Sequence, residues 1–109
     1  MSERVVLVSV LQDGVSHETY EDFVRRVLLP MARKLPSVQS YEVTALRELV
    51  EDSGEPSPGD YIDFIEVSNL EDYGRDLEQM LGTDAGKTFE DRWQAYVARY
   101  VSLRGEKIE

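Results

Sequence analysis

Residues 5–11 read VVLVSVL, an apolar run in which neither alternating set of side chains is polar as a whole. Successive side chains of a strand point to opposite faces, so Val6, Val8 and Val10 face one way and the odd-numbered residues face the other. A strand that is apolar on both faces must be covered on both. The helices of one 109-residue chain cover only one face of a small sheet. We therefore expect a second copy of the chain to cover the other face.

An amphipathic helix is expected after the first strand, which should span residues 4–11. Apolar residues recur three or four positions apart over residues 20–35, and this spacing places them on one stripe. Ser16 or Thr19 is suited to cap the start of this helix. Pro30 removes one helical hydrogen bond, so it should bend the helix about one turn earlier.

The remaining chain predicts three more strands and two more helices. Residues 51–60, EDSGEPSPGD, are acidic and rich in proline and glycine, which is typical of a mobile loop. The order β-α-β-β-α-β, with a small extra helix before the last strand, indicates an α+β, ferredoxin-like single domain. Its four-stranded antiparallel sheet should carry both helices on one face. The expected elements are strands over 38–49, 61–67 and 98–107, a helix over 70–81 capped by Ser68 or Asn69, and a short helix holding Phe89 and Trp93.

Composition excludes several classes of protein. Acidic residues outnumber basic ones 22 to 12, giving a net charge of −10, which disfavours binding to nucleic acids and to anionic membranes. Cysteine is absent, so no disulfide, thiolate nucleophile or thiolate metal site is expected. The sequence shows no signal-peptide pattern and no membrane-spanning apolar run, and we expect a cytoplasmic protein.

Residues 11–43 and 61–77 resemble the RedY-like (HapK) family of the dimeric α+β barrel superfamily. The resemblance rests on Asp13-Gly14-Val15, on the helix with Tyr20 and Pro30, on LPSV at 35–38 and on DFIEV at 63–67. It implies a homodimer whose two sheets form a barrel, with a small-molecule pocket between sheet and helices in each subunit. Members of this family are associated with bacterial secondary metabolism, including prodigiosin-type pigment pathways. There they are thought to assist condensation, cyclisation or dehydration without a cofactor.

Two motifs that suggest other chemistry are better explained structurally. The segment GTDAGKT at 82–88 has three residues between its glycines, where a phosphate-binding loop needs four, and it follows a helix instead of a strand. Thr83 or Thr88 is more simply a helix cap. One histidine and no cysteine leave no ordinary ligand set for zinc or haem. The acids of the 51–60 loop match no calcium-loop spacing, so we expect a solvated loop.

His17 and Asp63 are the candidates for proton transfer. His17 is the only side chain with an unperturbed pKa near neutrality, although it lies at a helix start where histidines are commonly just exposed. Asp63 and Glu66 interrupt a strand at an odd spacing, so one should face the helices and the other the dimer barrel. The favoured structural alternative is a cross-strand ion pair of either acid with an arginine. The arginines considered are Arg47, Arg99 and Arg104.

Aromatic side chains are the candidates for substrate binding. A tyrosine combines an apolar body with a hydroxyl, which suits the wall of a pocket for an aromatic ligand, although plain core packing is the commoner role. Ser9 shows no sign of a partnered nucleophile. The candidate binding residues are Tyr20, Tyr61, Tyr73 and Trp93.

These features lead to one functional expectation with two alternatives. The leading one is a cofactor-independent enzyme of secondary metabolism that condenses, cyclises or dehydrates an aromatic or pyrrole-like intermediate. It would enclose the substrate in a dry cavity and move one proton with Asp63 or His17. The alternatives are a dimeric carrier that shields a hydrophobic metabolite, and a cofactor-free monooxygenase.

Overall fold

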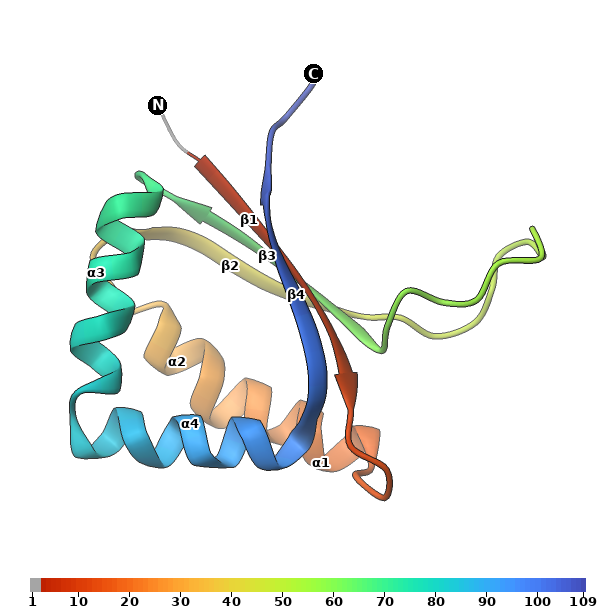
Figure 1. Ribbon diagram of the computed structural model, residues 1–109, viewed down its shortest axis with the longest axis horizontal. Coiled ribbons are helices and arrows are strands. Elements are labelled where there is room, and N and C mark those ends of the chain that lie inside the picture. The colour runs from red at the N-terminus through yellow and green to blue at the C-terminus, as the bar shows by residue number, and fades with distance from the viewer. Residues whose placement is uncertain (1–2) are drawn as a thin grey trace.

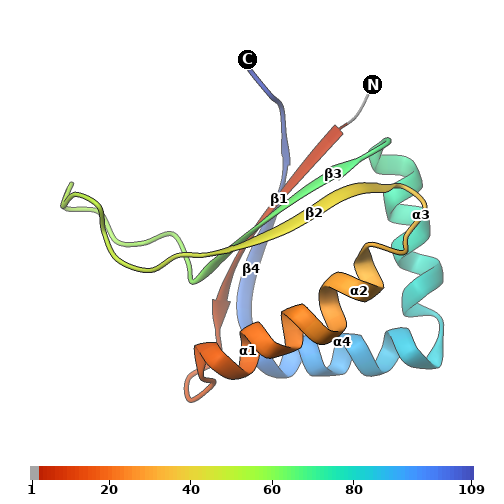
Figure 2. The same ribbon diagram turned by 180° about the vertical axis from the view of Figure 1, so that it is seen from behind.

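The computed structural model describes residues 3–109, which form a four-stranded antiparallel sheet in the order β2-β3-β1-β4. All the helices lie on one side of this sheet (Figures 1 and 2). This order confirms the expected ferredoxin-like α+β topology. The elements are β1 (Glu3–Leu11), α1 (His17–Phe23), the π-helical segment η1 (Val24–Leu28), α2 (Leu29–Ala32), β2 (Val38–Ala45), β3 (Tyr61–Val67), α3 (Leu70–Leu81), α4 (Asp84–Tyr96) and β4 (Val97–Gly105).

The first helix bends where Pro30 requires it to. Ser16 caps α1 by accepting a hydrogen bond from the Thr19 backbone N–H. One turn before Pro30 the helix widens into η1, in which the Leu29 N–H reaches back to the Val24 carbonyl. Proline offers no N–H to the turn before it, and the wider turn accommodates that loss. This irregular turn lies at the position predicted for the bend, one turn before Pro30.

Strand β2 ends at Ala45, so the predicted extension to residue 49 is wrong. The Leu46 N–H donates to the Asp60 carbonyl, and the two chain segments separate after that bond. Pro56 and Pro58, on the returning segment, have no N–H with which to continue the ladder. Residues 46–60 therefore form a long arm that projects from the end of the sheet (Figures 1 and 2).

The glycine-rich segment at 82–88 is a tight corner between α3 and α4. Thr83 caps α4 by accepting a hydrogen bond from the Gly86 N–H, which confirms the capping interpretation. A Cβ atom at Gly86 would overlap the Met80 carbonyl oxygen, so this position tolerates only glycine. Helix α4 has 13 residues and is longer than the short helix expected. Helix α3 begins at Leu70, where Asn69 is its cap.

The two faces of the sheet differ in how they are covered. Val5 pairs with Ile65, Leu7 with Asp63 and Ser9 with Tyr61, and this set faces the helices, where the core lies. The opposite set is covered by no helix of residues 3–109 (Figures 1 and 2) and is half-buried or exposed in the single chain, with Phe64 46% exposed. No helix in the described part of the chain is both long and apolar enough to cross a membrane. The apolar residues of the open face are Val6, Val8, Val10, Ile62, Phe64, Val101 and Leu103.

Candidate functional site

A cavity of about 430 Å³ lies between the sheet and the helices. This volume is within the range of small-molecule pockets, roughly 300–1,000 Å³. Its wall is mainly aliphatic and aromatic, with few polar groups. The lining residues are Val5, Leu7, Leu28, Met31, Ala32, Leu35, Tyr41, Asp63, Ile65, Tyr73, Leu77, Met80, Leu81, Phe89, Glu90, Trp93, Gln94, Tyr100 and Ser102.

Asp63 is the one acid that the sheet contributes to this cavity. It sits mid-strand in β3, between Leu7 of β1 and Val43 of β2, and its side chain points to the helix side. Asp63 is only 1% exposed. The Tyr41 hydroxyl donates a hydrogen bond of 2.6 Å to Asp63 Oδ2, whereas Oδ1 has no hydrogen-bond partner among the described residues. A buried carboxylate oxygen without a partner is costly, so its presence calls for an explanation.

Burial raises the pKa of Asp63 to about 6, although the hydrogen bond from Tyr41 acts to lower it. Asp63 also affects the tyrosines around it. Burial, and after it the charge of Asp63, raise the pKa of the Tyr73 hydroxyl to about 12. Burial and the same charge raise the pKa of Tyr41 well above its ordinary value. Asp63 is therefore the group in this cavity that can take up or release a proton near neutral pH.

The expectation that the two strand acids lie on opposite faces is confirmed, because Glu66 lines a separate cavity on the open face. The favoured ion pair of Asp63 with an arginine is wrong. Arg47 pairs with Glu21 at 2.9 Å, and Arg104 pairs with Glu3 at 3.4 Å. Asp63 lies on the buried side of a central strand, which a long cationic side chain from the sheet edges does not reach.

His17 does not line the cavity. It is an exposed residue at the start of α1, with Nδ1 2.8 Å from the Tyr61 hydroxyl. Tyr61 donates in turn to Glu21 Oε2 at 2.7 Å, and Arg47 binds the same carboxylate. The Tyr61 hydroxyl uses its hydrogen for the bond to Glu21. Its oxygen therefore accepts a hydrogen bond from His17, in the tautomer with hydrogen on Nδ1. The structure thus places the two proton-transfer candidates, His17 and Asp63, in separate surroundings.

Of the four aromatic candidates, Tyr73 and Trp93 line the cavity and Tyr20 and Tyr61 do not. The Tyr20 ring is fully buried and packs against Tyr61, with 4.8 Å between ring centroids. The Tyr20 hydroxyl lies near Ser9, whose own hydroxyl is buried without a well-formed hydrogen bond. Tyr20 is therefore a core residue that packs against the Tyr61 ring.

Sequence reasoning did not single out Tyr41 as the partner of Asp63. Both residues lie on the helix side of neighbouring strands, but the pairing depends on the β2–β3 register, in which Tyr41 lies opposite Ile65. That register shifts between Val38 and Ser40, and a shift of this kind leaves no clear mark in the sequence. The available signal was a tyrosine on a strand next to the strand of a buried acid.

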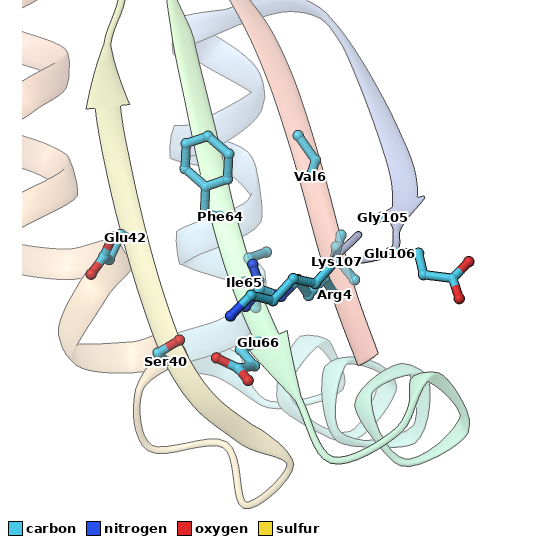
Figure 3. A pocket seen from close by; sticks show the side chains of 11 residues that line it. Arg4, Val6, Ser40, Glu42, Phe64, Ile65, Glu66, Gly105, Glu106 and Lys107 are labelled. Carbon is cyan, nitrogen blue, oxygen red and sulfur yellow. The ribbon is translucent and has the colours of Figure 1, made fainter. Parts of the chain in front are cut away.

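A second cavity, of about 460 Å³, lies on the open face at the end of the sheet that holds the chain termini (Figure 3). Phe64 and Val6 stand on its surface, beside Glu42 and Glu66. Its wall also carries the cationic residues Arg4 and Lys107. No group of three or more residues able to ligate a metal was found between residues 3 and 109.

The family model described as REDY-like protein HapK matches residues 3–108. The chain belongs to this family. No curated protein matches the sequence.

Solved structures share the fold of this HapK-family chain at low sequence identity. At3g17210 from Arabidopsis thaliana matches with a TM-score of 0.73 and 12% identity, over 98% of this chain and 96% of that one. HapK from Hahella chejuensis matches with a TM-score of 0.66 and 16% identity, over 96% and 92%. A protein of unknown function from Thermobifida fusca, described as dimeric and ferredoxin-like, matches with a TM-score of 0.68 and 13% identity, over 98% and 92%.

Proposed function

We propose that this protein is a cofactor-independent enzyme that condenses, cyclises or dehydrates a reactive aromatic or pyrrole-like intermediate. The reaction takes place in the cavity between the sheet and the helices, and Asp63 moves the proton. Family membership supports the fold and the general class. The cavity and its single buried sheet acid support the chemistry.

The observation that carries this proposal is the state of Asp63. Tyr41 holds one oxygen, the other has no hydrogen-bond partner in the described part of the chain, and the pKa is raised to about 6. An acid with a pKa near the working pH serves both as proton donor and as proton acceptor. Such a group contributes roughly 10²–10⁴-fold to a rate, which suffices for a substrate that is already reactive.

The proposal includes a homodimer formed through the open sheet face. That face carries Phe64, Val101 and Leu103, each about half exposed in the single chain. A contiguous exposed apolar surface on a sheet is a site of association. Neighbours of the same fold are described as dimeric, which supports the same arrangement here.

Turnover assays with and without oxygen test the reaction class. Suitable probes are pyrrole-2-carbaldehyde with 2,4-dimethylpyrrole, which condense with loss of one water, and a linear triketone, which cyclises. Oxygen-independent turnover supports the proposal. Turnover that requires oxygen indicates a monooxygenase, and saturable binding without turnover indicates a carrier; either result contradicts the proposal.

Variants at the two proton-transfer candidates test the site. Replacement of Asp63 by Asn keeps the shape but removes the titrating group, so we expect turnover to fall about 10²-fold or more. Replacement of His17 by Ala serves as the matched control, because His17 contacts Tyr61 outside the cavity, and this variant should retain most of the activity. A full-rate Asp63→Asn enzyme with normal folding would exclude Asp63 as the proton-transfer group.

A further inference from the structure

The charges that line the central cavity are all of one sign. Asp63 lies in its sheet wall and Glu90 in its α4 wall, and neither lysine nor arginine is among its lining residues in the described chain. Gln94 binds Glu90 through its amide, at 3.3 Å. The cavity therefore offers a negative potential without a cation of its own to balance it.

Asp63 is an uncompensated charge when it is ionised. A buried carboxylate normally has a cationic partner, because taking an ion out of water costs several kcal/mol. Among residues 3–109 the only direct partner is the neutral Tyr41 hydroxyl, and Oδ1 has no hydrogen bond within this range. A positively charged ligand in the cavity would supply the missing charge, because Asp63 is part of the cavity wall.

The aromatic wall is suited to the same kind of ligand. Trp93 and Tyr100 meet nearly at right angles, with 4.9 Å between ring centroids, and Tyr73 and Phe89 also line the cavity. The faces of aromatic rings attract cations, most strongly those of tryptophan and tyrosine. Rings together with carboxylates are a recurrent arrangement for binding an ammonium group.

We propose that this cavity selects ligands of the protonated-amine class, an apolar body with a single positive charge at nitrogen, and that it rejects carboxylates and phosphates. The ammonium group lies in the part of the cavity next to Asp63, and the apolar body occupies the space between α3, α4 and the sheet. This inference rests on the function proposed above, because it concerns the same cavity. It extends that function by naming the charge that the cavity prefers in a ligand.

Binding of three probes of nearly equal shape tests the charge preference, measured by isothermal titration calorimetry with the full-length protein. Phenethylamine is cationic at neutral pH, 2-phenylethanol is neutral and phenylacetate is anionic. We expect the amine to bind at least about tenfold more tightly than the alcohol, and phenylacetate not to bind. Equal affinity of amine and alcohol, preferred binding of phenylacetate, or no binding of the amine would each overturn the inference.

The Asp63→Asn variant tests whether Asp63 is the source of the preference for the amine. It should bind phenethylamine and 2-phenylethanol with similar affinity, because the charge is lost while the shape is kept. A tenfold preference that survives in this variant contradicts the assignment to Asp63. Replacement of Glu90, the half-buried acid of the α4 wall, by Gln is the matched control, and it should weaken amine binding less than the change at Asp63.

A pH titration of the unmodified protein keeps the test independent of any variant's folding. The titratable groups around Asp63 are tyrosines of β2, α1 and α3, with Glu90 of α4 at the wall; these are Tyr41, Tyr20, Tyr73 and Glu90. The three tyrosines stay protonated between pH 5 and 8. Amine affinity should therefore rise about tenfold through pH 6 as Asp63 ionises, whereas affinity for the alcohol should not rise. A flat amine profile would count against the inference. These are binding measurements, so their failure is distinct from a failure of turnover.

Discussion

At the scale of single residues, Asp63 works against the stability of the fold. Its pKa is raised to about 6 from an ordinary 3.8, chiefly by burial. An acid with a raised pKa in the folded state stabilises that state below its unfolded pKa, and this contribution is lost as the pH rises through the folded pKa. Retention of such a group in a cavity wall is typical of a functional site.

The Asp63→Asn variant should remove this pH dependence. As the pH rises from about 4.5 to about 7.5, the unmodified protein should lose roughly 2 kcal/mol of unfolding free energy that the variant does not lose. Urea denaturation at both pH values, at one fixed protein concentration, measures the change. If the difference between the two proteins does not vary with pH, Asp63 does not titrate in this range.

Replacement of Tyr41 by Phe should raise the pKa of Asp63 above about 6, because the hydroxyl of Tyr41 stabilises the ionised form. Carbon-13 NMR titration of the Asp63 carboxyl group measures the shift. Tyr73→Phe is the matched control, since its hydroxyl makes no recorded hydrogen bond to Asp63. An equal shift in both variants would mean that loss of any nearby hydroxyl, and not of this hydrogen bond, is responsible.

At the scale of elements, the α3–α4 pair shows how position decides what a glycine does. Gly74 lies on the exposed side of α3, and nothing stands within 4 Å of where its Cβ would be. Gly86 lies at the corner, where the backbone of Met80 fills that space. The two residues look alike in the sequence, and only the packing separates them.

Gly74→Ala should therefore stabilise the protein by up to about 1 kcal/mol, because alanine is the better helix former. Gly86→Ala should destabilise it by roughly 1–3 kcal/mol or more, since the α3–α4 corner must open to admit the methyl group. Thermal and urea denaturation of both variants measure the two effects. Loss of stability in Gly74→Ala, or none in Gly86→Ala, would contradict this account of the corner.

At the scale of the whole molecule, a single chain leaves the apolar open face of the sheet uncovered. Strand β1 is apolar on this side as well as on its helix side, and β3 and β4 continue the surface with Phe64, Val101 and Leu103. The arm at residues 46–60 also exposes apolar residues, including Leu49 at 60%. Exposure alone therefore does not distinguish the open face from the arm, whereas contiguity on the sheet favours the open face as a site of association.

Two leucines of similar exposure give a matched test of the dimer. Leu103→Asp places a charge on the open face, where Leu103 is 54% exposed, and should raise the dimer dissociation constant on the order of 100-fold. Leu49→Asp makes the same change on the arm and should leave the dimer intact. Analytical ultracentrifugation at micromolar concentration separates these outcomes. Dissociation caused by Leu49→Asp alone would move the interface to the arm.

Much of the fold was predictable from local patterns. Strand β3 and helix α3 have the bounds expected, the Pro30 bend lies where it should, and the alternation in β3 places Asp63 and Glu66 on opposite faces. These features depend on neighbours in the chain, because period, caps and proline act over one or two turns. The end of β2 was not predictable in this way, since it depends on where a distant partner segment stops donating hydrogen bonds.

The amino-acid sequence by itself determined the order of the elements, a sheet with two apolar faces and an acid buried on one of them. Only the tertiary structure decided that Asp63 meets Tyr41 instead of an arginine, that His17 lies outside the cavity, and that no lysine or arginine of residues 3–109 lines its wall. The physical reason is that a local pattern sets which way a side chain points. The surroundings of that side chain come from strands and helices tens of residues away, brought together by register and packing.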